Sequence, residues 1–375
     1  MKYIDEYRNR EQAEALCRAI ARVAVRPWRI MEVCGGQTHA IARYRLEEML
    51  PRTVSLLHGP GCPVCVTPEH VIDRAIHLAL QPRVTLATFG DMMRVPGSRS
   101  DLLRAKAGGA DVRILYSPLD AVGLAAGYPE REVVFFAVGF ETTLPAHLAA
   151  LKEALRRRLR NFSLLTSFFT VPPAMEAILS DPQCRVDGFL AAGHVCAVTG
   201  NAAYRPLAEK YGTPVVVSGF EPLDLLYGIY RCVCRLEAGE GGVENAYKRA
   251  VSEAGNPRAL ALIREMLEPC GGEWRGLGHI PQSCLRLRET CEAFDAAKRF
   301  AFPPPSPTPS GCIAGEIMRG LAQPSQCPCF GTSCRPEHPA GAPMVSSEGV
   351  CAAYFRIRPE AATQRPDDAA PALGR

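Results

Sequence analysis

Short apolar runs and longer amphipathic segments alternate along the chain from residue 28 onward. The apolar runs are nearly continuous instead of alternating with polar residues, which is typical of parallel strands that are covered on both faces. In the segments between them, apolar residues recur about once per helical turn, as in residues 69–80 and 144–159. This pattern predicts eight strands, over residues 29–33, 53–58, 84–89, 112–116, 132–138, 162–169, 186–192 and 214–218.

Four strand–helix units followed by four more favour an α/β protein with two doubly wound parallel-sheet domains that face a cleft. We assign residues 28–128 to the first domain and residues 129–234 to the second. After residue 234 the alternation stops, and helical patterns over 243–254 and 257–267 precede a loop-like region rich in Gly and Cys. The remaining assignments are a smaller mixed C-terminal domain (235–358), an N-terminal helix packed on it (1–27) and a disordered tail (359–375).

Composition narrows the possible functions. The 375 residues are 47% hydrophobic with a net charge of +4, and no basic run is interleaved with aromatic residues, so nucleic-acid binding is disfavoured. No apolar run approaches the ~20 residues needed to cross a bilayer, and the N-terminus lacks the apolar core of a signal peptide. We therefore expect a cytosolic protein. In that reducing compartment the sixteen cysteines favour metal, cluster or redox roles over a disulfide framework.

The first strand leads into residues 31–39, MEVCGGQTH, where a thiol is followed by two glycines and a group of polar side chains. Gly35 and Gly36 allow a sharp turn and a close approach to a ligand. Cys34 should lie at the carboxyl end of the strand and face the start of the helix that Thr38 opens, so its thiol should ionise readily. With His39 one turn into that helix, the pair resembles half of a metal site. A small buried Cys and a helix-capping Thr are an equally good interpretation.

Two thiols separated by two residues follow the second strand, in Cys62-Pro-Val-Cys65. Thr67 is a good N-cap and Pro68 suits a first helical position, so a helix should begin just after the pair. This setting favours a low-pKa redox dithiol or two ligands of one metal over an inert buried pair.

Other polar residues also collect after the predicted strands, where parallel sheets bind their ligands. Glu141 and Thr142 follow the fifth strand and could bind a ligand or, as we favour, cap the next helix together with Thr143. His194 follows the seventh strand, as a ligand contact or as a structural histidine. Near the C-terminus, four cysteines could hold a zinc ion or a cubane cluster, with Cys329 as a spare ligand: Cys312, Cys327, Cys334 and Cys351.

Several of these motifs together resemble the HypD family of hydrogenase formation proteins. They are MEVCGGQTHAI (31–41), HGPGCPVCVTP (58–68), GFETT (139–143), WRGLG (274–278), GEIMRG (315–320) and MVSSEGVCAAYF (344–355). The similarity runs from about residue 3 to residue 355. Two positions depart from the family pattern: Cys196 stands where Ser is usual, and Cys329 where an apolar residue is usual.

The resemblance implies a scaffold that works with the small partner HypC to assemble the Fe(CN)2CO unit of nickel–iron hydrogenase. HypE delivers cyanide, and the hydrogenase large subunit is reached through HypC. Cys34 would hold the iron, Cys62 and Cys65 would form the redox pair, and His39 matches the first motif's histidine. The cofactor-binding loops would contribute Gly35, Gly36, Gln37, Thr38, Glu141, Thr142 and His194, and a 4Fe-4S cluster in the C-terminal domain would be bound by Cys312, Cys327, Cys334 and Cys351.

Two other functions fit the same residues. A cluster-dependent protein disulfide reductase, similar to ferredoxin:thioredoxin reductase, would use the dithiol and the cluster without any iron–cyanide chemistry. A structural zinc protein would use only the C-terminal cysteines. On the family resemblance we expect a maturation scaffold with thiol-redox chemistry, not a turnover enzyme.

Overall fold

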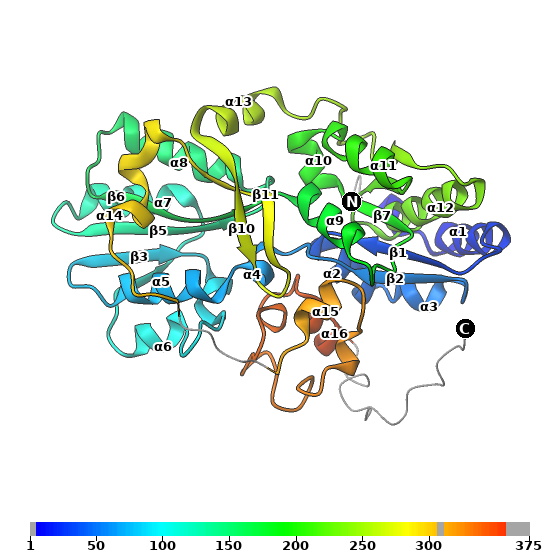
Figure 1. Ribbon diagram of the computed structural model, residues 1–375, viewed down its shortest axis with the longest axis horizontal. Coiled ribbons are helices and arrows are strands. Elements are labelled where there is room, and N and C mark those ends of the chain that lie inside the picture. The colour runs from blue at the N-terminus through cyan, green and yellow to red at the C-terminus, as the bar shows by residue number, and fades with distance from the viewer. Residues whose placement is uncertain (1–4, 306–310, 358–375) are drawn as a thin grey trace.

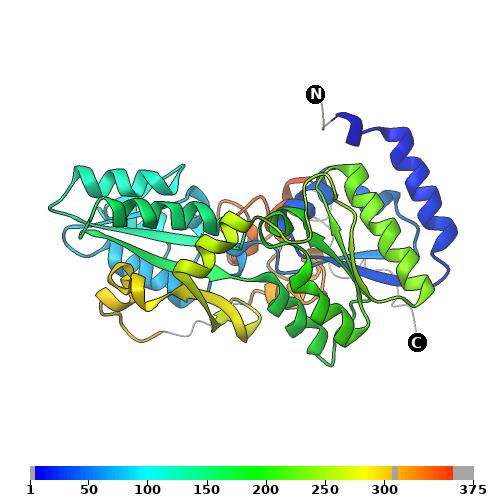
Figure 2. The same cartoon turned by 90° about the horizontal axis from the view of Figure 1, so that it is seen from above.

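The computed structural model describes residues 5–305 and 311–357. Two α/β lobes lie side by side along the long axis of the molecule, and a cysteine-rich segment (311–357) lies against the region where they meet (Figure 1). The N-terminal helix α1 (Arg10–Val23) lies on the outer side of one lobe (Figure 2). The α/β class is confirmed.

One lobe, called the β1 lobe below, is built on a parallel sheet with the order β2–β1–β7–β8–β9. Its strands are β1 (Trp28–Glu32), β2 (Val54–His58), β7 (Gly188–Ala192), β8 (Pro214–Ser218) and β9 (Gly242–Asn245). Its helices are α1, α2 (Gly35–Arg43), α3 (Leu46–Met49), α9 (Val171–Ser180), α10 (Gly193–Thr199), α11 (Arg205–Tyr211) and α12 (Pro222–Ala238), with short 3-10 helices at Asp5–Tyr7 and Ala202–Tyr204.

The other lobe, called the β5 lobe, has a mixed sheet with the order β10–β11–β6–β5–β3–β4. Its parallel strands are β3 (Val84–Thr88), β4 (Val112–Ile114), β5 (Glu132–Gly139) and β6 (Phe162–Phe169). The antiparallel hairpin β10 (Leu267–Trp274) and β11 (Gly278–Leu287) extends it beside β6. Its helices are α5 (Glu69–Ala79), α6 (Leu102–Ala107), α7 (Pro118–Gly127), α8 (Leu144–Arg156), α13 (Pro257–Met266) and α14 (Ala296–Arg299), with 3-10 helices at Gly90–Arg94 and Glu289–Phe294.

All eight predicted strands are present within a few residues, but the predicted domain boundaries do not follow the sheets. Strands β1 and β2 pair with β7, β8 and β9, and β3 to β6 form the other sheet. The chain therefore crosses between the lobes after β2, through α4 (Pro63–Val66), again after β6, and a third time after β9. The division into 28–128 and 129–234 assumed that neighbouring strands in the sequence share a sheet, whereas contacts between distant segments decide the pairing.

Three further expectations need correction. Residues 243–254 form the edge strand β9 and turns, not a helix. The loop-like Gly- and Cys-rich region is the β10–β11 hairpin, in which Gly276 and Gly278 adopt positive φ angles at the turn. Helix α1 packs on α12 of the β1 lobe through Cys17 and Ile20, not on the C-terminal segment, because its apolar face meets the complementary face of α12.

The cysteine-rich segment contains α15 (Ala314–Met318), α16 (Val350–Ile357) and 3-10 helices at Pro324–Gln326 and Ala342–Met344. Its small apolar core includes Phe330, Met344 and Tyr354. The domain predicted over residues 235–358 is therefore not a single unit, since its hairpin belongs to the β5 lobe. The predicted tail (359–375) lies outside the described residues. Within the described part, no helix is long and apolar enough to span a membrane.

Candidate functional site

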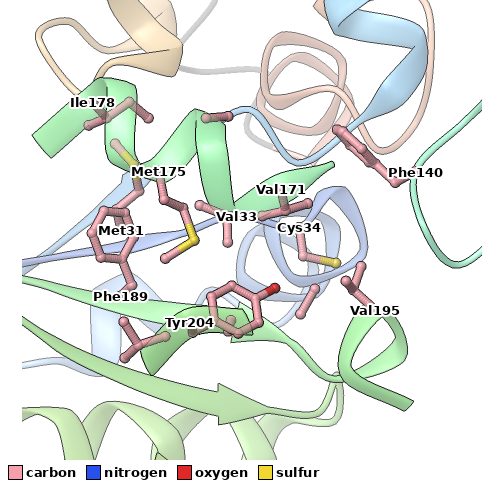
Figure 3. Packing of buried hydrophobic residues seen from close by; sticks show 14 of the residues in the cluster. Met31, Val33, Cys34, Phe140, Val171, Met175, Ile178, Phe189, Val195 and Tyr204 are labelled. Carbon is pink, nitrogen blue, oxygen red and sulfur yellow. The ribbon is translucent and has the colours of Figure 1, made fainter. Parts of the chain in front are cut away.

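The carboxyl ends of the two sheets meet between the lobes. Val33 and Cys34 follow β1, and they share one hydrophobic cluster with Phe140, which follows β5, and with Val195 in α10 (Figure 3). Val171 at the start of α9 belongs to the same cluster. The chain therefore brings loops from separate strands to one place, as expected for the ligand edge of parallel sheets.

Cys34 is held in place by the backbone around it. Cys34 is the N-cap residue of α2, and its neighbour Gly35 donates its N–H to the Gly61 carbonyl, 2.9 Å away. A Cβ at Gly61 would come within 2.2 Å of the Cys34 nitrogen, so only glycine permits this packing. The loop that carries the Cys62–Cys65 pair is therefore in direct contact with the loop that carries Cys34.

The Cys34 thiol lies beside the ring of His194. Its sulfur lies 3.7 Å from His194 Nδ1, and the His194 ring stacks on Phe220 with the ring centroids 5.0 Å apart. Burial lowers the pKa of His194 to about 4, so the ring is neutral and can accept a hydrogen bond from the thiol.

The expectation that Cys34 ionises readily is wrong for the free protein. The side chain is 1% exposed, and burial raises the pKa of the Cys34 thiol well above its ordinary range. The start of α2 favours a negative charge, but the loss of water around the sulfur outweighs it.

The ring of His39 does not reach Cys34. Its Nδ1 lies 3.2 Å from the Ser347 carbonyl oxygen, so the side chain faces the cysteine-rich segment. The histidine beside Cys34 is therefore His194 and not the predicted His39. Sequence reasoning chose the nearer histidine in the chain, and only the pairing of β1 with β7 brings His194 close.

Beneath Cys34, buried polar side chains form a continuous hydrogen-bonded chain that the sequence analysis missed. Glu32 accepts the Cys34 N–H at 2.8 Å with Oε2, and its Oε1 accepts from Thr38 and lies 2.7 Å from His58 Nδ1. His58 Nε2 lies 2.7 Å from the Tyr354 hydroxyl, which donates to Glu47 at 2.8 Å. We call these side chains the floor of the site.

Burial alone would lower the pKa of His58, but the hydrogen bonds and charges of Glu32 and Glu47 raise it to about 9. The ring is therefore a cation between two carboxylates. It connects β2 to α16, so the floor joins the β1 lobe to the cysteine-rich segment. The one signal in the sequence was a Glu and a His at the ends of two largely apolar strands.

Opposite the floor, the loop after β5 carries buried polar atoms without hydrogen-bond partners among the described residues. They are Glu141 Oε2 and Thr142 Oγ1, and Gln37 Oε1 on the β1 lobe shares this condition. Burial raises the pKa of Glu141 to about 7, although its other oxygen accepts the Val171 N–H at 2.9 Å.

The predicted capping role is not observed for this loop. Thr143 is the N-cap residue of α8, yet its side chain makes no capping hydrogen bond. Groups that are buried without partners reduce stability, and an ordered water, an ion or a ligand can supply the missing bonds. The Tyr204 hydroxyl is directed toward Cys34 (Figure 3), and Cys196 lies beside Tyr204.

The Cys62–Cys65 pair lies in the turn of α4, with Cys62 as its N-cap residue. The Cys65 N–H donates to Cys62 Sγ at 3.3 Å. Burial raises the pKa of Cys65 well above its ordinary range, and the thiols of Cys62 and Cys351 add to the rise, so the expected low-pKa dithiol is not supported at Cys65. The predicted N-cap Thr67 instead donates its hydroxyl to the Pro63 carbonyl at 2.8 Å.

A narrow pocket connects this pair to both neighbouring regions. Cys62 and Cys65 line it together with Gly35 and Thr38 of the Cys34 loop and Glu348 of the cysteine-rich segment. The pair therefore lies between Cys34 and Cys351.

The C-terminal cysteines are neighbours of one another. Burial raises the pKa of Cys351 well above its ordinary range, with further contributions from three nearby thiols, those of Cys312, Cys334 and Cys327. Cys334 Sγ accepts the Ala340 N–H at 3.3 Å, and Cys329 adds to the raised pKa of Cys312. Among the described residues, no three His, Cys, Asp or Glu side chains form a group that could hold one metal ion.

This donor set fits an iron–sulfur cluster, in which each thiolate binds a different iron atom and the sulfurs stand apart. Cys312 Sγ packs against the backbone of Gly341, where a Cβ would come within 2.4 Å of the sulfur, so glycine is needed at this position.

Comparison with known proteins gives a consistent result. The family model "HypD: Hydrogenase formation hypA family" matches residues 11–358. The chain is 48% identical to the "Hydrogenase maturation factor HypD" of Rhizobium leguminosarum bv. viciae over 366 residues, which cover 95% of both chains. It is 48% identical to that of Azotobacter vinelandii, over 95% of this chain and 96% of the relative. It is 45% identical to that of Escherichia coli (strain K12), over 96% and 98%.

Proposed function

Because the chain belongs to the HypD family of hydrogenase maturation factors, we propose that it is the scaffold and redox protein on which the Fe(CN)2CO unit is assembled. HypC is its stable partner in this proposal. HypE delivers the cyanide, and the finished unit reaches the hydrogenase large subunit through HypC.

One observation carries the proposal: three groups of cysteines follow one another in space. The Cys34 loop is hydrogen-bonded to the loop of Cys62 through Gly35 and Gly61. Cys351 in turn lies close enough to Cys65 to raise the pKa of the Cys65 thiol. Electrons entering at the cysteine-rich segment thus have a short path to the thiol proposed to hold iron.

Cys34 is the proposed iron ligand, because a soft thiolate suits iron that carries strong-field ligands. His194 Nδ1 lies 3.7 Å from the Cys34 sulfur, and the floor fixes the Cys34 backbone through Glu32. The unpartnered Thr142 hydroxyl, and Glu141 when it is protonated, are the hydrogen-bond donors available to cyanide nitrogens.

Cys62 and Cys65 are the proposed redox pair. Their disulfide takes up two electrons and two protons to become two thiols, and the reverse step returns them. Cys312, Cys327, Cys334 and Cys351 would hold a 4Fe-4S cluster, which would supply one-electron chemistry beside the pair. The pair lines a narrow pocket together with Gly35 and Glu348, so only a small group can reach its sulfurs from there.

Cys34→Ala tests the iron assignment. The variant, purified anaerobically with HypC, should lack the cyanide and carbonyl stretches in its infrared spectrum, while the Cys62–Cys65 pair still cycles between disulfide and dithiol. Retention of both stretches by this variant would overturn the assignment. Cys196→Ser is the matched control, because it removes another buried thiol near the site and should keep the stretches.

Cys351→Ser tests the cluster. We expect it to lose nearly all bound iron and sulfide, because Ser is a poor substitute for a thiolate at iron. Cys329→Ser, a neighbouring cysteine outside the proposed ligand set, should keep the full content. Equal losses in the two variants would show that the ligand set is wrongly chosen.

A cluster-dependent protein disulfide reductase is the second candidate, since the proximity of Cys65 to Cys351 favours it as well. It predicts reversible dithiol oxidation and no iron–cyanide signal in any preparation with HypC. Infrared spectra of the wild-type complex therefore separate the two functions.

A further inference from the structure

Two cysteines outside the site face each other across the β10–β11 hairpin. The antiparallel register sets Cys270 opposite Cys284, two residues along from the pair of Glu268 with Arg286. Since side chains alternate between faces, both thiols leave the sheet on the face that carries the Glu268–Arg286 ion pair. Both are free thiols and partly exposed.

The spacing of such a pair matches that of a disulfide. Directly opposed residues of an antiparallel ladder have Cα atoms ~4.5 or ~5.5 Å apart, and disulfides span Cα separations of roughly 4.4 to 6.8 Å. Gly272 leaves open the space where the Cys284 sulfur lies, because a Cβ there would come within 2.4 Å of it. The ladder is also irregular between Cys270 and Gly272, which gives the hairpin freedom to adjust.

We propose that Cys270 and Cys284 form a reversible cross-strand disulfide when the chain meets a low-molecular-weight disulfide such as oxidised glutathione. One thiolate attacks a sulfur of the reagent, a mixed disulfide forms and one small thiol leaves. The second cysteine then attacks the mixed disulfide, the bond between Cys270 and Cys284 forms, and the second small thiol leaves. The chain gives up two electrons and two protons, which reduce the reagent to two thiols.

The reaction should be slow. Burial raises the pKa of Cys284 to about 11, and that of Cys270 is also raised, so little thiolate is present at neutral pH. A bond at this position closes a hairpin whose tip reaches the proposed redox pair. Arg275 donates its backbone N–H to the Val66 carbonyl and its Nε to the Thr67 carbonyl, each at 2.8 Å.

The same hairpin contributes Trp274 to the hydrophobic cluster that contains Cys34. The Trp274 indole donates to Ser283 Oγ at 2.8 Å, and its ring packs against Phe169 with the centroids 4.8 Å apart. Oxidation of Cys270 and Cys284 therefore restrains a segment that supports the site. This inference stands independently of the iron-assembly proposal.

The test is a disulfide map of the full-length chain, reduced under nitrogen and then exposed to a graded series of oxidised glutathione. After quenching and alkylation, trypsin cuts after Arg275, so the bond joins two separate peptides. We expect this linked pair to accumulate as alkylation of Cys270 and Cys284 falls together, and dithiothreitol to release it. Cys184→Ser, a partly exposed cysteine of the other lobe, should leave the linked pair unchanged.

Cys270→Ser should leave Cys284 alkylated or capped by glutathione, and Cys284→Ser should do the same for Cys270. The proposal is overturned if both cysteines stay alkylated at every oxidant concentration. It is equally overturned if they appear only as separate glutathione adducts or bonded to other cysteines. The wild-type map alone decides between these outcomes if a serine variant folds poorly.

Discussion

Among the described residues, buried polar side chains are hydrogen-bonded in the floor beneath Cys34 but keep unpaired oxygens in the loop of Glu141 and Thr142, which we call the wall of the site. In the floor, Glu32, His58 and Tyr354 are linked by hydrogen bonds that continue to Glu47. In the wall, Glu141 Oε2 and Thr142 Oγ1 have no hydrogen-bond partner within the described residues. A paired floor fixes the position of the thiol, and an unpaired wall retains bonding capacity that a ligand can use.

Removing the charge from the floor should have the largest effect on stability. His58→Ala leaves Glu32 buried at 0% exposure without its cationic partner, so we expect a loss of ~3–5 kcal/mol in the free energy of unfolding. Chemical denaturation of the purified chain measures this. His279→Ala, an exposed histidine of β11, should change the same quantity by less than about 0.5 kcal/mol.

Tyr354→Phe sharpens this prediction, because it removes one hydroxyl and keeps the His58–Glu32 pair. The free energy of unfolding of this variant should be about 1–3 kcal/mol lower than that of wild type. A His58→Ala variant as stable as His279→Ala would mean that the floor does not fix the structure.

The second prediction uses pH, because two buried histidines respond at opposite ends of the scale. The pKa of His58 is raised to about 9 from an ordinary 6.5, so its stabilisation is complete below pH 6.5 and is lost as the pH rises through 9. The pKa of His147 in α8 is lowered by burial to about 4. The neutral His147 ring contributes fully to the free energy of unfolding above pH 6.5. This contribution falls by ~3 kcal/mol as the pH drops from 6.5 to 4.

His147→Gln keeps a side-chain N–H but cannot titrate. The free energy of unfolding of this variant should therefore lose ~3 kcal/mol less than wild type between pH 6.5 and pH 4, and change equally above pH 7. Parallel curves for the two proteins throughout the acid range would contradict the assignment.

The strands were predictable from the sequence because burial on both faces leaves a local mark. After Glu132, β5 is apolar throughout, and β6 interrupts its apolar residues only with Ser and Thr, so each is buried over nearly its whole length. Strand order left no such mark, since the pairing of β1 with β7 joins residues 158 positions apart, as in Met31 with Phe189. The β10–β11 hairpin was missed because its glycines are typical of loops and also of bulges and turns.

The site was predictable where a residue type alone indicates chemistry. Cys34, Cys62 and Cys65 were found because thiols after strands are unusual, and their loops do meet. His58 and Tyr354 were missed because the floor is formed by a contact between β2 and α16, which are far apart in the sequence. The ionisation of Cys34 was misjudged because burial, which the sequence does not give, outweighs the helix terminus.

Thr142→Val should give the smallest change and separates the wall from the floor most sharply. The variant keeps the shape of the side chain and removes a buried hydroxyl that has no partner among residues 5–305 and 311–357, so the free chain should become more stable by about 1 kcal/mol. Ser167→Ala is the matched control, because the Ser167 hydroxyl lies 3.2 Å from that of Thr67 and its loss should cost about 1 kcal/mol.

If the wall binds the iron unit, Thr142→Val should also retain it several-fold less well in the HypC complex, by infrared intensity. A variant that is stabilised and retains the unit fully would remove Thr142 from the site, and one destabilised like Ser167→Ala would show that its hydroxyl already has a partner.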